Sequence, residues 1–295
     1  MFYDSTHWVS KIPSSLGIKS VCYNVVCAAS IAIAFVPVRN VTRERDTTEE
    51  ELANPLAGYP SSNVILHKHE ARNLLFISKE FGDGITFYER ITTGFKKCNV
   101  IAIRTCRKLE GNFCDYLASQ YKKPVFLMGP VLPEPEESQL EARWSEWLGQ
   151  FAPGSVIFCA FGSQFILDKD QFQELLSGFE STGQPFLLAL KPPTGCSTVE
   201  EAFPEGFEER VKGRGVVYGD TEHKIDGWRV EGCCRSVKGR EWLGVKGELV
   251  QSYQGSGVGS IVREKHAKWR EILVSQGFMS GCIDSFIKDL EGLLV

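Results

Sequence analysis

The sequence predicts an α/β fold built on parallel strands, because short apolar segments alternate with segments of helical periodicity. Two strand–helix–strand units are the clearest, one at residues 100–128 and one at residues 155–190. Strands joined by a crossover helix pair in parallel with a right-handed connection. Between them, residues 133–138 read PEPEES, an acidic segment with two prolines that is typical of an extended connector. We therefore expect two α/β parts that join near residue 138.

The composition is that of a globular protein, and 295 residues are enough for one large or two modest domains. Apolar residues make up 43% and charged residues 24%, which excludes a disordered or collagen-like chain. The net charge of -4 argues against a protein held on nucleic acid, which needs a basic face. We expect no nucleic-acid partner.

The ten cysteines form no Cys-x-x-Cys pair and match no zinc spacing. Several lie in apolar runs, where a free thiol packs as a small hydrophobic group. The first residues, MFYDSTHW, lack the basic flank and apolar core of a secretory signal. These features predict reduced thiols, no bound metal and a cytoplasmic location.

Residues 21–38, VCYNVVCAASIAIAFVPV, form the one stretch that resembles a membrane span in length. Asn24 lies inside this stretch and Pro37 lies near its end. We interpret it instead as a buried strand at 20–26 that leads into a buried helix at 28–36, since strands of parallel sheets are continuously apolar. No transmembrane segment is expected.

In the first strand–helix–strand unit, VIAIR at 100–104 is a strand, and PVFLM at 124–128 is the returning strand before Gly129. The helix between them is expected at 109–121. Its predicted apolar side consists of Leu109, Phe113, Tyr116 and Leu117.

After the connector, a helix carries Trp144, Trp147 and Leu148, and the second unit follows. SVIFCAF at 155–161 is a buried strand, and PFLLAL at 185–190 is its returning partner. Asp168 is placed to cap the intervening helix, which Gly183 ends. The apolar stripe of that helix is Phe172, Leu175, Leu176 and Phe179.

The last forty residues predict two helices. The second has a regular apolar stripe that is typical of core packing rather than of a partner groove. Residues 220–257 differ from the rest, because they are rich in Gly, Arg, Lys and Glu and show neither a strand nor a helical period. The stripe of the final helix is Met279, Ile283, Phe286, Ile287, Leu290, Leu293 and Leu294.

Gly162 and Ser163 follow the strand at 155–161, so they lie at the carboxyl end of a parallel strand, where open α/β sheets bind ligands. Backbone N–H groups and a hydroxyl in such a turn suit a phosphate. By itself this signal is weak, because most strand-to-helix turns contain Gly or Ser and bind nothing.

Three segments, GPVLPEP, SVIFCAFGSQ and PEGFEERVKGRGVVYG, resemble plant family-1 UDP-glycosyltransferases. The resemblance is greatest to the branch that adds a sugar to flavonoid or anthocyanidin glycosides. It spans residues 2–219, with further stretches such as THW, EELANP, GYPSS and ITFYERITTG, and it resumes at about residue 259.

The resemblance implies a GT-B type fold of two Rossmann-like domains, both incomplete here. Residues 1–138 would be a partial acceptor-binding domain with its linker. Residues 139–295 would be a partial UDP-sugar-binding domain that ends in helices at 259–295. Members of the family transfer the sugar of a UDP-sugar co-substrate to a small-molecule acceptor, without a metal or another cofactor. For this chain the resemblance implies a flavonoid-like glycoside as the acceptor.

The resemblance also carries over two residues. Asp4, in FYDSTHW, matches the Asp that orients the family's catalytic His, which removes the acceptor proton as a general base. Ser163 matches the hydroxyl residue that approaches the donor diphosphate. Without the family match, Asp4 would be a plain aspartate at a strand end and Ser163 a turn-forming serine.

This sequence departs from the family pattern in two places. The catalytic His is expected on a segment before Asp4, and only three residues precede Asp4 here. The donor signature box should follow Gly219, where the sequence instead reads DTEHKIDGWRVEGCC. Because the flanks of 220–258 resemble the family and its interior does not, a misassembled exon or a frame shift is one explanation.

No other histidine is a good replacement for the missing base. His7 lies three residues from Asp4, and the two side chains meet only if the local backbone permits. His67 and His69 are expected to be solvated, His223 lies in the anomalous section, and His266 lies on a helix face. We therefore expect an impaired enzyme. The alternatives are a non-catalytic flavonoid-binding remnant and an unstable pseudogene product.

Overall fold

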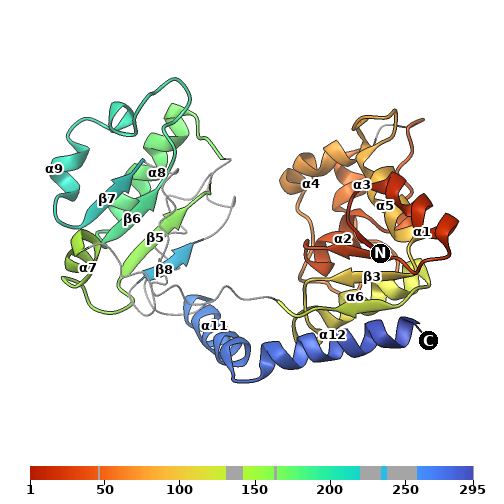
Figure 1. Cartoon of the computed structure of the whole chain (residues 1–295). Helices are drawn as coiled ribbons and strands as arrows, with labels where there is room; N and C mark the ends of the chain where they lie inside the picture. Colours follow the sequence, from red (N-terminus) through yellow and green to blue (C-terminus); the bar gives the residue numbers. More distant parts are fainter. Residues whose placement is uncertain (46, 131–141, 163–164, 220–233, 238–257, 295) are drawn as a thin grey trace. The chain divides into compact units, whose positions relative to one another are not determined.

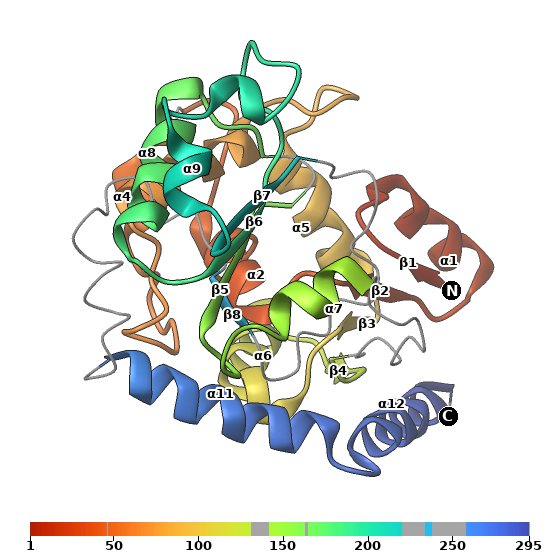
Figure 2. The same ribbon diagram turned by 90° about the vertical axis from the view of Figure 1, so that its left-hand side faces the viewer.

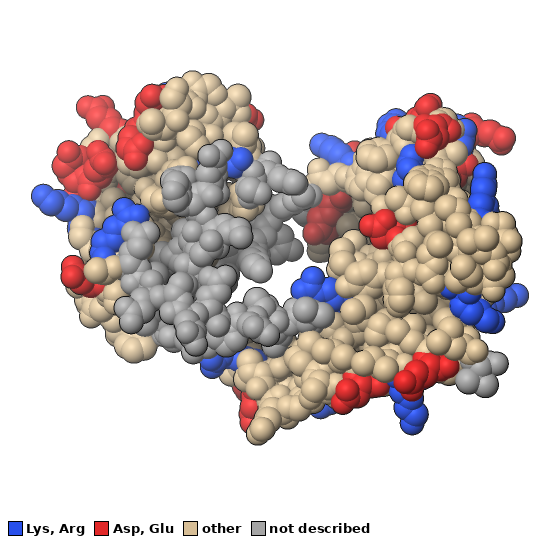
Figure 3. Space-filling view, viewed as in Figure 1, with Lys and Arg blue, Asp and Glu red and all other residues tan. Residues whose placement is uncertain are grey.

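The computed structural model describes residues 1–45, 47–130, 142–162, 165–219, 234–237 and 258–294, which form two compact units (Figures 1 and 2). Unit 1 consists of Met1–Pro133 with Trp269–Val295, and unit 2 of Glu134–Lys268. Each unit contains a four-stranded sheet whose described strands pair in parallel. On the face shown in Figure 3, acidic and basic side chains are interspersed over the described residues.

The sheet of unit 1 has the order β1-β2-β3-β4, with Tyr3 opposite Cys22 and Ile101 opposite Val125. The strands predicted at 20–26, 100–104 and 124–128 are confirmed, and the first strand, for which no bounds were predicted, has only two residues and ends just before Asp4. The bounds are β1 Phe2–Tyr3, β2 Val21–Asn24, β3 Val100–Ile103 and β4 Val125–Leu127.

The apolar stretch at 21–38 folds as β2 followed by helix α2 (Ala28–Ala34), as predicted. Ala28, Ile31 and Ala32 are almost completely buried in the protein interior. Within the described ranges, none of the helices combines the length and the hydropathy of a membrane-crossing segment.

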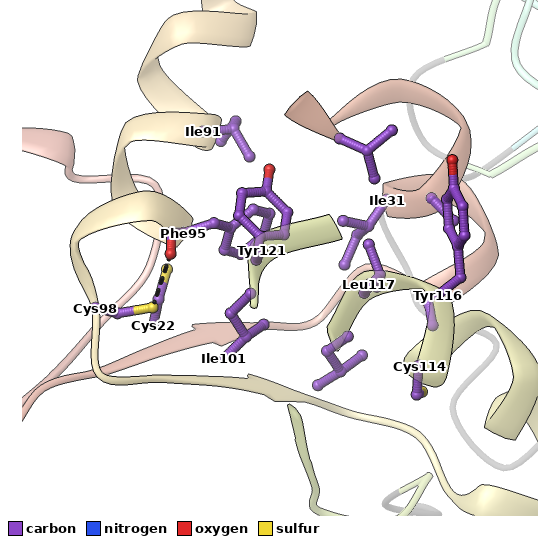
Figure 4. Packing of buried hydrophobic residues seen from close by; sticks show 14 of the residues in the cluster. Cys22, Ile31, Ile91, Phe95, Cys98, Ile101, Cys114, Tyr116, Leu117 and Tyr121 are labelled. Atoms are coloured by element: carbon purple, nitrogen blue, oxygen red, sulfur yellow. Dashed lines mark hydrogen bonds between the residues drawn. The ribbon is translucent and has the colours of Figure 1, made fainter. Parts of the chain in front are cut away.

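One face of this sheet packs against α2, α5 (Phe87–Lys97) and α6 (Arg107–Tyr121). Figure 4 shows the resulting core, in which aliphatic and aromatic side chains from these helices lie over the sheet. Cys98 belongs to this core and donates its thiol to the carbonyl of Phe95 at 3.2 Å. All cysteines whose side chains are described are free thiols.

The predicted stripe of the 109–121 helix is correct at Tyr116 and Leu117, which are buried, but wrong at Leu109, which is 38% exposed. The reason is a kink: Glu110 has the non-helical angles φ -136 and ψ 25, so the first turn leaves the path of the rest of α6. The Glu110 carboxylate instead accepts the backbone N–H groups of Ala28 and Ala29, at 3.1 and 2.9 Å.

The other face of the sheet is covered by α12 (Phe278–Leu294), which packs along the strands although it lies far away in sequence (Figure 1). Phe286 is buried against Val21, Val100 and Ala102, with Leu290 and Leu293 beside it. The predicted stripe is therefore core in part only. Its remaining edge is exposed, at Ile283, Ile287 and Leu294.

Between α2 and α5, short helices form a satellite layer around a small second core of Val41, Leu52, Ala71, Ile77 and Tyr88. Thr48 and Glu51 form a capping box at the start of one of them. The helices of unit 1 outside the sheet layers are η1 His7–Ser10, α1 Lys11–Leu16, η2 Pro37–Arg39, α3 Glu49–Ala53, α4 Lys68–Leu74 and η3 Leu75–Ser78.

The sheet of unit 2 has the order β7-β6-β5-β8. The strands predicted at 155–161 and 185–190 are confirmed as β5 and β6. The bounds are β5 Val156–Ala160, β6 Phe186–Ala189, β7 Gly215–Tyr218 and β8 Cys234–Val237.

Strand β8 corrects the expectation that residues 220–257 contain no strand. It pairs in parallel with β5, with Val156 opposite Cys234 and Cys159 opposite Val237. The strand pairs through its backbone groups, which any sequence supplies. Its side chains, CRSV, form no apolar run, so the composition gave no signal for a strand. The rest of 220–257 lies outside the described residues. The structure therefore does not test whether a misassembled exon or a frame shift produced this section.

Helix α8 (Lys169–Ser181) packs on this sheet through Phe172, Leu176 and Phe179, as the apolar stripe predicts. Asp168 is its N-cap residue, and its N–H donates to Gln171 Oε1 at 3.3 Å. The remaining helices are α7 Ala142–Leu148, η4 Glu200–Ala202, α9 Phe207–Val211 and α11 Val258–Val274.

Candidate functional site

The sheet of unit 2 contains a reversal of strand order beside β5. From β5 the chain proceeds through β6 to β7 on one side, and it then returns to β8 on the opposite side of β5. In open α/β sheets, ligands bind outside the carboxyl ends of the strands at such a reversal. Cys159 is paired with Val237, so β5 and β8 end at the same level. The topology thus places a candidate ligand site after Ala160.

The described part of the turn that follows β5 contains a glycine with a left-handed backbone. Gly162 adopts φ +75, and a Cβ at this position would meet no atom within 4 Å. The flanks of the turn are anchored, because the rings of Phe161 and Phe165 pack at 5.4 Å and Leu167 is buried. Ser163 lies outside the described residues, so its role stays a prediction.

Asp4 follows β1 at the carboxyl edge of the other sheet. Its neighbour Tyr3 is buried, and the Tyr3 hydroxyl donates to the carbonyl of Gly94 at 2.9 Å. The backbone carbonyl of Asp4 accepts the Cys22 thiol at 3.6 Å. These contacts hold the backbone of Asp4 against the core, while the residue itself is exposed.

The structure does not bring His7 and Asp4 together. Among the described residues, neither a hydrogen bond nor an ion pair joins their side chains, and the His7 Nδ1 atom is buried without a hydrogen-bond partner. Burial lowers the pKa of His7, and the positive charge of Arg90 lowers it further, while Asp83 opposes this shift. The imidazole therefore lies in the field of Arg90 and Asp83.

The other histidines of the described part are also poor candidates for a base at Asp4. His67 is the N-cap residue of α4 and His266 lies on α11, and both are exposed. His223 and the side chain of His69 lie outside the described residues. In the part of the chain that the structure covers, no group of three His, Cys, Asp or Glu side chains is arranged to hold a metal ion.

Sequence reasoning missed two exposed apolar residues at this edge of the sheet. Val25 and Val26 follow β2 and are 63% and 44% exposed. The pairing of Tyr3 with Cys22 places the ends of β1 and β2 side by side, so the valines share the edge with Asp4. The sequence signal is present, because the apolar run continues beyond the last paired residue, Asn24, but an apolar run alone predicts a longer strand rather than an exposed edge.

The chain matches no protein-family model. It is 43% identical to anthocyanidin 3-O-glucoside 2'''-O-xylosyltransferase of Arabidopsis thaliana, over 98% of this chain and 74% of that protein. It is 42% identical to UDP-glucosyl transferase 79T1 of Saponaria officinalis, over 100% of this chain and 75% of that protein. The first alignment extends over 345 residues, more than this chain contains, so that relative has residues inside the aligned region that are missing here.

Solved structures share the fold. A UDP-glucosyltransferase from Polygonum tinctorium has a TM-score of 0.70 at 17% identity, covering 98% of this chain and 75% of that one. UGT71G1 of Medicago truncatula, solved with UDP-glucose, has a TM-score of 0.65 at 18% identity, covering 99% and 74%. These matches confirm the predicted α/β fold of GT-B type with Rossmann-like units. With the identity to the curated relatives across nearly its whole length, the chain belongs to the plant UDP-glycosyltransferase family.

Proposed function

We propose that this chain acts on a flavonoid or anthocyanidin glycoside, to which sugar from a UDP-sugar is transferred at a hydroxyl group. The observation that carries the proposal is the 43% identity, over 98% of the chain, to a protein named as an anthocyanidin 3-O-glucoside xylosyltransferase. In this reaction the acceptor oxygen attacks the anomeric carbon of the sugar, the acceptor proton passes to a base, and UDP leaves.

The donor site we propose lies at the reversal between β5 and β8. Two features support it. Gly162 has a left-handed backbone, and the space that a Cβ at this residue would occupy is open. A diphosphate suits the N–H groups of such a turn, because they donate to anionic oxygens without the volume of a side chain. Ser163 would add its hydroxyl to the same group.

The acceptor site we propose lies at the carboxyl edge of β1 and β2. Val25 and Val26 are exposed there, and Trp8, in the η1 turn that follows β1 in the chain, is 54% exposed. Apolar side chains suit a flat aromatic acceptor, since binding removes their surface from water. Asp4 shares this edge and would orient an imidazole that receives the acceptor proton.

A protein made of these 295 residues alone should turn over slowly. Among the described residues, no imidazole hydrogen-bonds to Asp4, and His7 lies near Arg90 and Asp83 instead. Loss of a general base lowers the rate by about 10²–10⁴-fold. Weakened donor binding would add to this loss, since the donor signature is absent after Gly219.

The test is turnover by purified protein of UDP-glucose, UDP-xylose, UDP-rhamnose and UDP-galactose with a panel of flavonoid 3-O-glucosides, followed by mass spectrometry. We expect product at least 10²-fold more slowly than with the Arabidopsis xylosyltransferase run in parallel. Asp4→Asn should leave this residual rate unchanged if no imidazole contacts Asp4. Turnover equal to that of the relative, lost in Asp4→Asn, would overturn the proposed impairment.

A second candidate is a binding protein without catalysis, favoured by the exposed apolar edge beside Asp4, which no imidazole of the described residues contacts. Quenching of Trp fluorescence by flavonoid glycosides, with no binding of UDP, would support it. A cooperative thermal transition would argue against the third alternative, an unstable product. Sequencing the transcript across 219–259 would decide whether the anomalous section belongs to the protein.

A further inference from the structure

Four exposed lysines lie at the amino edge of the unit 1 sheet, where its strands begin. They are Lys19, just before β2, Lys96 and Lys97, at the end of α5, and Lys122, the C-cap residue of α6. We call these four residues the basic edge. Asp4 follows β1 at the opposite, carboxyl edge of the same sheet, so the basic edge is separate from the proposed acceptor site.

Hydrogen bonds hold the three segments that carry these lysines beside one another. Ser20 donates its backbone N–H to Oδ1 of Asn99 at 2.8 Å, which ties the start of β2 to the end of α5. Lys123 donates its Nζ to the carbonyls of Lys96 and Cys98, which ties the end of α6 to the end of α5. The charges of the basic edge are therefore brought together by the fold, although they are distant in sequence.

The charges of the basic edge are not neutralised by ion pairs. Within the described ranges, none of its four amines pairs with a carboxylate, and the acids near the end of α12, Asp289 and Glu291, are exposed. Lysines in the last turn of a helix interact favourably with its dipole, which gives Lys96 and Lys97 a structural role as well. Lys19 lies on no helix and has no such role. Grouped like charges raise the local positive potential and attract anions, even on a chain with a net charge of -4.

Large apolar side chains are exposed beside these lysines. Leu16, Ile18 and Phe2 are 63%, 45% and 56% exposed. Ile18 is next to Lys19 in the chain, and Phe2 lies opposite Val21 at the start of β2. Figure 2 shows α1, which Leu16 ends, and β1 on the same side of unit 1. Single exposed apolar residues are common, but a group of them among lysines marks an interaction surface.

We propose that the basic edge, with these apolar side chains, binds peripherally to a membrane that contains anionic phospholipid. The lysine amines lie at the lipid phosphates and carboxylates, and Phe2, Leu16 and Ile18 enter the interfacial layer. The same charges would attract an acidic protein. The apolar residues favour lipid, because a bilayer interface accepts apolar side chains without a complementary surface. Such binding needs no membrane-crossing helix, and the described helices include none.

The test is co-sedimentation of the full chain with vesicles of phosphatidylcholine alone and of phosphatidylcholine mixed with phosphatidylserine. We expect at least tenfold tighter binding to the mixed vesicles at about 0.1 M salt, and most of this difference should be lost at about 0.5 M salt. No binding to the mixed vesicles, or equal binding to both kinds, would overturn the proposal. Neither UDP nor an acceptor is present, so the result does not depend on the proposed function.

A charge variant locates the surface. Lys96→Gln combined with Lys97→Gln should weaken binding to the mixed vesicles at least tenfold, because each lysine near an anionic surface contributes about fivefold. The matched control is Lys79→Gln combined with Lys108→Gln, which removes the same charge from exposed lysines near the opposite ends of α5 and α6. The control should bind normally. Equal weakening in both double variants would show that overall charge, not the basic edge, attracts the lipid.

An apolar variant separates a membrane from an acidic protein. Leu16→Ser combined with Ile18→Ser should weaken binding to the mixed vesicles severalfold, whereas Val64→Ser, at an exposed valine of unit 1 outside this surface, should not. Poly-L-glutamate is the probe for an acidic partner. If it binds the chain while the mixed vesicles do not, or if the apolar variant binds the vesicles normally, the surface is not a membrane-binding surface of the kind proposed.

Discussion

The two sheets contain the same number of parallel strands but differ in strand order. In unit 1 the strands follow the chain from β1 to β4, whereas in unit 2 the order reverses at β5 and β8. In open α/β sheets a reversal opens a crevice at the carboxyl ends of its two strands, so the backbone of unit 2 places a candidate ligand site there. Asp4 follows β1, an edge strand that, among the described strands, pairs with β2 alone. Topology therefore supports the proposed donor site more strongly than the role of Asp4.

The largest predicted effect is the loss of stability when a core phenylalanine of either unit is removed. Phe172 in unit 2 and Phe95 in unit 1 are almost completely buried, and replacing either with Ala should cost about 3–5 kcal/mol. If the units unfold separately, each variant should speed amide hydrogen exchange in its own sheet only. Loss of protection in both sheets from one substitution would show that the units unfold together.

The next effect concerns α12, which covers one face of the unit 1 sheet. Phe286→Ala should destabilise unit 1 by about 3 kcal/mol, because Phe286 is buried against Val21, Val100 and Ala102. Ile287→Ala is the matched control, since Ile287 is 47% exposed and should cost about 0.5 kcal/mol or less. Chemical denaturation measures both values. Equal costs would contradict the packing described for this helix.

Much of this comparison was accessible from the sequence. The apolar runs at β2, β3, β5 and β6 predicted the central strands, because strands buried on both faces need apolar side chains throughout. The edge strands were predicted less well: β1 was expected only as a strand end at Asp4, and β7 and β8 were not predicted. β1 has two residues and β8 has no apolar run, and pairing through backbone groups leaves little trace in the side chains.

The candidate sites were less accessible, for a physical reason. Asp4 came from the family resemblance alone, and the local pattern at Ser163, a Gly-Ser turn after a parallel strand, is too common to mark a site without that resemblance. The kink at Glu110, which turns Leu109 outward, arises from a long-range contact with the first residues of α2, which periodicity along the helix does not reveal.

Gly162 offers a smaller but sharper test of the site in unit 2. Gly162→Ala places a side chain at φ +75 and should destabilise unit 2 by about 1–2 kcal/mol. Gly183 has φ +67 and equally open surroundings, but it lies before β6, away from the carboxyl end of β5. Gly183→Ala should therefore have a similar cost in stability. In calorimetry with UDP, only Gly162→Ala should weaken any binding, and equal weakening in both variants would remove support for this turn.

The smallest effect is a difference in the pH dependence of the two units. The pKa of His7 lies below its ordinary value of 6.5 because burial and Arg90 disfavour the charged form. The unfolded chain therefore takes up this proton at a higher pH than the folded chain, so unit 1 loses stability as the pH falls below about 6.5. In unit 2, Arg210 lowers the pKa of Glu180 below 4.5, so the stability from this pair is lost only at lower pH.

Hydrogen exchange at pH 7 and pH 5.5 can separate these contributions after correction for the intrinsic exchange rate. We expect the sheet of unit 1 to lose protection over this range, and His7→Gln to remove that loss, because Gln carries no proton that titrates there. The contribution of Glu180 should persist, since this range lies above 4.5. If His7→Gln leaves the pH dependence of unit 1 unchanged, then the imidazole is not held beside Arg90, and its position would again be compatible with a partnership with Asp4.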